Sequence, residues 1–310
     1  MAHSSHQKNM TLLTEVIAPL FFLIGIGYVI SKYRYIDVDS LADIALYVCL
    51  PFLIFSTLVR NPITGEMAFQ VLAWQAGMYF VSIPIVRLMA HIANWNKPTR
   101  SAITLSIPTI NVASYGLPVV MFAIGDRGLS VIMLLFVYSN ILSASLGVFI
   151  AAGSQKPPLE AFTNIFKLPT IYAIFAALIV QYIGIPVPLF FLDWATLVGK
   201  TGPILAIILL GVQLARVDTK EACDNGLLFW SIVAKVVIGP LIGITLAWFI
   251  GTEGVIRQVL FIASCLPTAI NALLLSSRFK ARPELLGRIL VGSTLWSPIN
   301  LLIVLHWLKL

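Results

Sequence analysis

Charged residues are scarce in this chain of 310 residues: they make up 11% of the sequence, whereas 59% is hydrophobic. About a quarter of the residues in a soluble domain are charged, so the chain has too little polar surface to cover a globule in water. The apolar residues also form long runs separated by short polar stretches. Because a helix needs roughly 20 apolar residues to cross a bilayer, the composition predicts an all-α polytopic membrane protein.

Residues that carry enzymatic or metal chemistry are also few. The three cysteines, Cys49, Cys223 and Cys265, show neither a disulfide framework nor metal-ligand spacing. None of the four histidines can be paired with a nucleophile, and the His-Glu-x-x-His pattern of metalloproteases is absent. We therefore expect no catalytic residue, no metal and no cofactor, which leaves an intramembrane enzyme as a remote alternative.

The net charge of +7 does not indicate a nucleic-acid partner, because the basic residues lie mostly in the short loops between apolar runs. Residues 1–10 are polar and precede no apolar core with a cleavage site, so we expect no cleaved signal peptide. The partner that composition does predict is the lipid bilayer, and we expect a multi-pass protein of the cell membrane.

The apolar runs predict ten spanning segments. Most loop Lys and Arg residues follow odd-numbered segments, as Lys32 and Arg34 follow the first. The positive-inside rule therefore predicts that these loops are cytoplasmic and that both termini are extracytoplasmic. The approximate bounds of the segments are 14–31, 40–59, 67–91, 101–124, 128–151, 168–183, 197–215, 226–250, 255–277 and 288–308.

Two short stretches look like copies of each other, Ser106-Ile107-Pro108-Thr109-Ile110-Asn111 and Cys265-Leu266-Pro267-Thr268-Ala269-Ile270-Asn271, and their asparagines are 160 positions apart. Ten segments with this offset make two five-helix units, residues 1–152 and 168–310, joined by a short linker, 153–167. Because five is odd, the second unit enters the membrane with the opposite orientation. The pattern predicts an inverted repeat, the plan of many secondary transporters.

The repeated stretches predict helices that break inside the membrane, because proline removes a backbone donor and clashes with the preceding turn. A helix that restarts in mid-membrane exposes amide groups with a partial positive charge, which favour an anion. The alternative is that the prolines only kink their helices. The predicted substrate-binding residues are Thr109, Asn111, Tyr115, Gly116, Pro118, Pro267, Thr268 and Asn271.

Lys235 lies inside the eighth segment, where a cation is costly. It is a candidate counter-charge for a substrate carboxylate or a tether to the broken helix; the alternative is a lysine that snorkels to the interface. No carboxylate lies deep in a segment. Coupling to H⁺ or Na⁺ would therefore use Asp43, the substrate's own carboxyl group or carbonyls at the breaks, and uniport stays open.

Several motifs resemble the auxin efflux carrier family. Asn111…Gly116-Leu117-Pro118 resembles the Asn-x4-Gly-x-Pro stretch of its fourth helix, and Lys235-x4-Pro240 resembles its eighth. Leu266-Pro267 followed by Ser276-Ser277-Arg278-Phe279 resembles its ninth helix. The chain lacks the long loop of the plant auxin exporters and is similar to compact bacterial members, including malate and malonate carriers. Two further stretches that fit are Leu50-Pro51-Phe52 and Leu210-Gly211.

The resemblance implies a scaffold and a transport domain, each built from both repeats, as in bile-acid symporters and sodium–proton exchangers. It implies that helices four and nine cross at the site of a small organic anion, such as malate, malonate, a 2-oxo acid or an auxin-like acid. It also implies elevator-type alternating access and a homodimer. A sodium- or proton-coupled symporter or antiporter of the same architecture is the alternative. We expect the first break to provide most of the substrate-facing backbone, and Pro267 and Asn271 to close the site.

Overall fold

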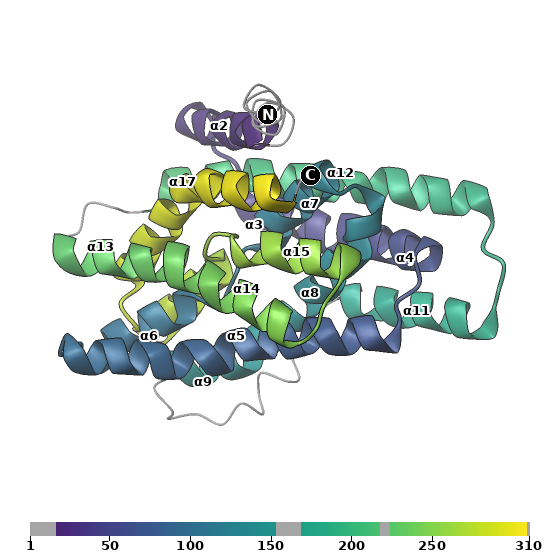
Figure 1. Ribbon diagram of the computed structural model, residues 1–310. Coiled ribbons are helices and arrows are strands. Elements are labelled where there is room, and N and C mark those ends of the chain that lie inside the picture. The colour runs from purple at the N-terminus through teal and green to yellow at the C-terminus, as the bar shows by residue number, and fades with distance from the viewer. Residues whose placement is uncertain (1–16, 153–168, 218–223, 309–310) are drawn as a thin grey trace, which may run out of the picture.

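The computed structural model describes residues 17–152, 169–217 and 224–308, and these are helical almost throughout, with no strand among them (Figure 1). The all-α class is therefore confirmed. The N-terminal residues 1–16, the whole of the predicted linker 153–167, and Cys223 lie outside the described residues.

In the part of the chain that the structure describes, six helical runs are long and apolar enough to cross a membrane: Val38–Arg60, Gly65–Ile92, Asp126–Ala151, Leu189–Arg216, Asn225–Phe249 and Pro283–Leu308. Four more apolar helices are shorter: Ala18–Tyr33, Val112–Ala123, Pro169–Ile183 and Gly254–Ser264. Each run overlaps one of the predicted segments. Ten complete crossings nevertheless stay a prediction, because these four helices are shorter than a bilayer span.

Prolines lie at two kinds of helix position: Pro98 lies in the first turn of α6, where no backbone donor is needed, and three others directly follow a π-helical turn inside a longer helical run. Pro51, Pro98, Pro118 and Pro240 all occupy the first or second helical position. Up to the linker, the described helices are α2 (Ala18–Tyr33), α3 (Val38–Asp43), α4 (Leu50–Arg60), α5 (Gly65–Ile92), α6 (Lys97–Ser106), α7 (Leu117–Ala123), α8 (Asp126–Leu142) and α9 (Val148–Ala151).

After the linker, seven further helices are described. They are α11 (Pro169–Ile183), α12 (Leu189–Arg216), α13 (Asn225–Val233), α14 (Gly239–Phe249), α15 (Gly254–Ser264), α16 (Ile270–Arg278) and α17 (Pro283–Leu308). The longest of these helices and α5 run roughly along one common direction, with α12 and α5 at opposite edges of the view (Figure 1).

Short π-helical turns, which often mark functional sites, interrupt the long helices. In the described residues they are η2 (Ile44–Cys49), η3 (Val112–Gly116), η4 (Ser143–Gly147) and η5 (Ala234–Ile238). Of these turns, η3 begins the second half of the first broken helix, and the other three lie in other segments.

One group of helices is held together by direct backbone contact. A Cβ atom added to Gly27 of α2 would lie 2.0 Å from the Ile208 carbonyl oxygen, and one added to Gly211 of α12 would lie 2.0 Å from the Ile24 carbonyl oxygen. Because glycine has no side chain, this reciprocal pair lets the backbones of α2 and α12 approach more closely than they could if either residue had a Cβ atom. Helix α4 packs on both α11 and α12, so α2, α4, α11 and α12 form one packed group.

The remaining long helices pack mainly with one another. Helix α5 packs on α8 and α14, α14 on α15, and α17 on α13 and α16. The buried Trp74 of α5 donates a hydrogen bond of 2.7 Å from Nε1 to the Gly243 carbonyl of α14. Residues far apart in sequence are thus joined in this second group, which holds both broken helices.

Basic loops predicted to be cytoplasmic meet in space. Arg282 donates a hydrogen bond of 2.8 Å to the Thr99 hydroxyl, which joins the loop after α16 to the start of α6. Lys32 and Arg216 line one hollow where α2 and α12 end. The loop after the third predicted segment therefore lies beside the loop after the ninth, and the loop after the first lies beside the loop after the seventh. The orientation of the termini stays a prediction.

Candidate functional site

Both predicted helix breaks are present. Helix α6 ends at Ser106, and helical structure resumes only at Val112. Helix α15 ends at Ser264, and α16 begins at Ile270. The prolines of the repeated stretches, Pro108 and Pro267, lie within these breaks, so they end their helices rather than kink them.

The two breaks lie side by side and run antiparallel. Ile110 and Thr268 form an isolated β-bridge. The Asn111 amide donates to the Pro267 carbonyl at 2.9 Å, and the Ala269 amide donates to the Thr109 carbonyl at 2.8 Å. Each break therefore provides hydrogen-bond partners for the backbone of the other, which hydrocarbon does not offer. We call this paired element the crossover.

In the first break, four successive carbonyl groups each accept a hydrogen bond from a different residue. A helix end leaves such groups without intrahelical partners. The donors are Thr268 Oγ1 to Ser106 (3.0 Å), Lys235 Nζ to Ile107 (2.9 Å), Gln75 Nε2 to Pro108 (3.1 Å) and the Ala269 amide to Thr109 (2.8 Å). Side chains of α5 and η5, together with the second break, thus hold the first break in place.

Lys235 and Gln75 are equivalent positions of the predicted repeat, because they share the 160-residue spacing of the two asparagines. Lys235 is 2% exposed, and its amino group reaches the Ile107 carbonyl. Of the roles considered for Lys235, this contact matches the tether to the broken helix. Lys235 does not line the cavity described below, and its amino group points into the protein rather than to an interface.

The second break leaves its restarting helix uncapped. Ala269 occupies the N-cap of α16 and provides no side-chain cap. Within the described chain, the amides of Ile270 and Asn271 donate to no protein group. In the first break, by contrast, Asn111 caps η3 because its Oδ1 accepts a hydrogen bond of 3.1 Å from the Ser114 amide.

A cavity of about 400 Å³ lies against both breaks. It brings together three of the predicted substrate-binding residues: Thr109, Asn111 and Asn271. The opposite wall comes from α3, η2, α11 and α12. The cavity therefore lies between the group of helices that contains α12 and the group that contains the crossover. Its apolar lining includes Leu46, Leu50, Phe136, Leu209 and Leu274.

Five predicted residues do not line this cavity. The Tyr115 hydroxyl lies 2.7 Å from Ser297 Oγ in the interior. Gly116 lies under the second break, where an added Cβ would be 2.7 Å from Leu266 Cδ1. Pro118 is buried at the start of α7. Pro267 and Thr268 serve the crossover itself, through the contacts with Asn111 and Ser106 given above.

Sequence reasoning missed several polar residues of the cavity wall. Asn140 accepts a hydrogen bond of 3.4 Å from Asn271 Nδ2, and Ser139 has a buried hydroxyl without a partner among the described residues. Each is a polar residue in an otherwise apolar segment, and this feature of the sequence could have identified both as candidates. The other missed polar residues are Asp39, Ser114, Ser143, Thr170 and Gln213.

The cavity contains almost no charge. Among the described residues, Asp39, an exposed residue of α3, is its one charged lining residue, and no Lys, Arg or His lines it. No group of three or more His, Cys, Asp or Glu residues that could hold a metal ion occurs in the described ranges. The arrangement therefore offers hydrogen-bond donors and an apolar wall to a small ligand.

Comparison with known proteins places the chain among transporters. The sequence profile of a family described as membrane transport protein matches residues 12–305. An uncharacterized transporter of Methanocaldococcus jannaschii is 22% identical over 94% of this chain and 97% of its own length. One of Methanothermobacter thermautotrophicus is 20% identical over 93% of this chain and 96% of its own. With its six apolar helices of spanning length, the chain is a multi-pass membrane protein and belongs to the membrane transport protein family, which includes the auxin efflux carriers.

Proposed function

We propose that this protein is a secondary transporter of small organic anions and that the substrate binds in the cavity beside the crossover. The observation that carries the proposal is the uncapped start of α16 on the cavity wall, with the Ile270 and Asn271 amides free of protein partners. A helix N-terminus favours an anion through its free N–H groups and its partial positive charge.

Two asparagine side chains add donors next to these amides. Asn111 uses its carbonyl oxygen to cap η3, which leaves its Nδ2 group for a ligand. Asn271 is exposed and makes only the long contact with Asn140. A carboxylate in the cavity would replace water at groups that the fold has left without strong partners. Its binding would therefore not have to break a network that holds the crossover together.

The cavity chemistry favours an acid with one negative charge and an apolar body. No cation of the described residues lines the wall, and Asp39 would repel a second carboxylate. Phe136, Leu50 and Leu209 provide an apolar surface for the rest of the molecule. Among the expected substrates, we propose that 2-oxo acids and auxin-like acids are preferred to malate and malonate.

We propose alternating access by relative movement of the two helix groups, with α2, α3, α4, α11 and α12 as the scaffold domain. Two features support this. The cavity lies between the groups, so a displacement of one along the other would change which side it faces. Packing is also reciprocal between the halves, because α2 packs on α12 as α11 packs on α4, which is what an inverted repeat predicts.

The test is counterflow of a labelled acid into proteoliposomes that contain the purified protein. The panel contains pyruvate, indole-3-acetate, malate and malonate, each with and without gradients of sodium ions and protons. We expect exchange of the monocarboxylates to exceed that of the two dicarboxylates. If no carboxylate exchanges, organic-anion transport is refuted, and a strict sodium requirement would favour the coupled-symporter alternative.

The site assignment is tested separately with Asn271→Ala and a matched control, Asn61→Ala. Asn61 is an asparagine at the end of α4 whose Nδ2 donates to the Thr57 carbonyl, and it does not line the cavity. We expect Asn271→Ala to reduce counterflow at least tenfold, and Asn61→Ala to leave it within about twofold of the unmodified protein. Equal effects of the two substitutions would remove the crossover cavity from the mechanism.

A further inference from the structure

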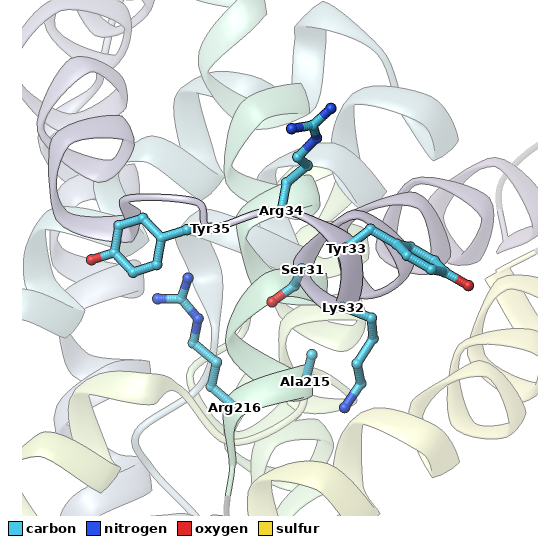
Figure 2. Close-up of a pocket in the computed structure, with 7 residues that line it drawn as sticks. All are labelled: Ser31, Lys32, Tyr33, Arg34, Tyr35, Ala215 and Arg216. Carbon is cyan, nitrogen blue, oxygen red and sulfur yellow. The ribbon is translucent and has the colours of Figure 1, made fainter.

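A second hollow, distant in sequence from the crossover, lies where α2 and α12 end. Its volume is about 530 Å³, and its lining comes from residues 31–35 and 215–216 (Figure 2). The ends of the two helices cannot readily separate, because Gly27 and Gly211 bring their backbones into direct contact further along. The hollow is therefore a fixed feature of the helix pair.

Basic side chains dominate this hollow. Lys32 and Arg34 come from the end of α2 and the residue after it, and Arg216 ends α12. Within the described ranges, none of the three forms an ion pair with a carboxylate. Among the described residues, the carboxylates nearest in sequence to these cations are Asp37 and Asp39. Asp37 is engaged as the N-cap of α3, where a hydrogen bond from Ser40 and the positive charge of Arg216 lower its pKa. Within the described ranges, the three cations therefore outnumber the two carboxylates.

Arg216 is held in position by two neighbours. Its guanidinium donates to the Ile36 carbonyl and lies over the Tyr35 ring, 5.6 Å from the ring centroid. These contacts keep the planar guanidinium group of Arg216 in one orientation, which reduces the entropy cost of binding an anion. Figure 2 shows the Arg216 side chain rising toward Tyr35 on one side of the hollow, with Lys32 on the other.

Small residues form the middle of the hollow. Figure 2 shows Ser31 and Ala215 between the Lys32 and Arg216 side chains, whereas Arg34 points away at the rim. The Ser31 hydroxyl has no hydrogen-bond partner among the described residues. Ala215 contributes only a methyl group, so the space between the two cations is unfilled. The Lys32 amino group, which lies 5.3 Å from the centroid of the Tyr28 ring, and the Arg216 guanidinium border the hollow, and the Ser31 hydroxyl lies between the two side chains. Such donors match a phosphate group.

The surroundings place this hollow at the edge of the hydrocarbon. Tyr33 and Tyr35 are 82% and 88% exposed, and tyrosines with such exposure are typical of the membrane interface. Val29 and Ile30, in the preceding turn of α2, are exposed apolar residues. A ligand with its phosphate in the hollow would therefore have apolar protein surface beside it on the membrane side.

We propose that the hollow binds the headgroup of an anionic phospholipid, with Lys32, Arg216 and Ser31 around the phosphate and the acyl chains along α2. A free phosphate ion would use the same charges but would leave the apolar surface of Val29 and Ile30 unused. The lipid would join the ends of α2 and α12. This inference is independent of the substrate cavity and of the transported acid.

The test measures lipid binding to the full chain in detergent, by titration with short-chain phosphatidylglycerol and phosphatidylcholine. We expect phosphatidylglycerol to bind more tightly and Lys32→Gln to weaken it about fivefold, the contribution of one cation near an anionic surface. The matched control is Lys97→Gln, which removes an exposed lysine at the start of α6 and should leave the affinity unchanged. Ala215→Leu, which fills the hollow without changing its charge, should also weaken binding.

Three outcomes would overturn the proposal. One is equal affinity for the two lipids, and another is an equal loss with Lys32→Gln and Lys97→Gln, which would indicate a diffuse charge effect. The third is complete displacement of the lipid by millimolar glycerol 3-phosphate, because a site for free phosphate gains nothing from the acyl chains. Unfolding midpoints of the variants in phosphatidylcholine, expected to match that of the unmodified protein, exclude misfolding as the cause of weaker binding.

Discussion

The two breaks of the crossover have almost the same sequence but differ in how their polar groups are satisfied. In the first break, four successive carbonyls accept hydrogen bonds, and Asn111 caps the restarting helix. In the second break, the carbonyls of Ser264, Cys265 and Leu266 accept no hydrogen bond within the described chain, and Ala269 leaves α16 uncapped. The repeated motif thus provides one break whose backbone groups are bonded to protein and one break with free backbone groups.

The difference suggests a division of labour between the two copies that is the reverse of the one expected from the sequence, in which the first break provided most of the substrate-facing backbone. Groups that bond to protein stabilise the fold, and groups that face the cavity without partners are available to a ligand. Substitutions in the first break should therefore lower the stability, whereas substitutions in the second should affect transport with little change in stability. This contrast is open to direct measurement.

The largest expected loss of stability comes from removing the tether at Lys235. Lys235→Met keeps most of the side-chain volume but leaves the buried Ile107 carbonyl without its donor, which should cost about 2 kcal/mol. Its repeat counterpart provides the comparison, because Gln75→Leu removes a neutral donor from Pro108 and should cost about 1 kcal/mol. Unfolding titrations in mixed micelles measure both. If Gln75→Leu lowers the free energy of unfolding more than Lys235→Met does, Lys235 is not the main side chain that stabilises the first break.

A smaller loss, combined with a transport defect, is expected for Asn111→Ala. This change removes the cap on the Ser114 amide, worth about 1 kcal/mol, together with a donor that faces the cavity. Asn111→Ser separates the two roles, because serine is also a good N-cap residue but has no amide group. We expect Asn111→Ser to restore most of the stability and little of the counterflow. Full recovery of both would confine Asn111 to a structural role.

The sequence predicted the breaks well because their causes are local. Pro108 and Pro267 prevent helical hydrogen bonds wherever they stand in an apolar run, and the repeated Pro-Thr and Ile-Asn pairs identified the two copies. The pairing of Ile110 with Thr268 shows that the copies meet. Ten spans, their inverted orientation and the two domains stay predictions, because four of the apolar helices are shorter than a span.

The site was harder to predict because it depends on which face each residue occupies. Tyr115 and Pro118 are close to Asn111 in sequence, but the turns after the break direct Tyr115 toward Ser297 and place Pro118 in the interior. Asn140 and Gln213 belong to other segments and reach the cavity only through packing between helices. No local pattern marks such residues, since one polar residue in an apolar helix has many structural explanations.

Because the backbone groups of the second break are free of protein partners among the described residues, we expect a substitution there to impair transport without lowering stability. Asn271 is exposed, and its bond to Asn140 is long, so Asn271→Ala should change the free energy of unfolding by less than about 0.5 kcal/mol. The unfolding titrations used for Lys235→Met measure this directly, beside the counterflow loss given above. A cost of 2 kcal/mol or more would mean that the second break is braced like the first, and the contrast between the copies would fail.

The smallest and most specific change makes the second break resemble the first. Ala269 already has the extended backbone of an N-cap residue, with φ −79° and ψ 151°. Ala269→Ser would let the new hydroxyl accept a hydrogen bond from the Asn271 amide, which should stabilise the protein by about 0.5 kcal/mol. The same bond would compete with the substrate carboxylate for that amide, so the apparent affinity in counterflow should fall severalfold while stability rises.

Ala269→Gly is the matched control, because glycine keeps the backbone conformation accessible without a side-chain acceptor and should leave the affinity unchanged. Opposite signs for stability and affinity in the serine variant, absent from the glycine variant, would be expected only if the free amides of α16 hold the anion. A serine variant that gains stability and keeps its affinity would place the carboxylate elsewhere in the cavity.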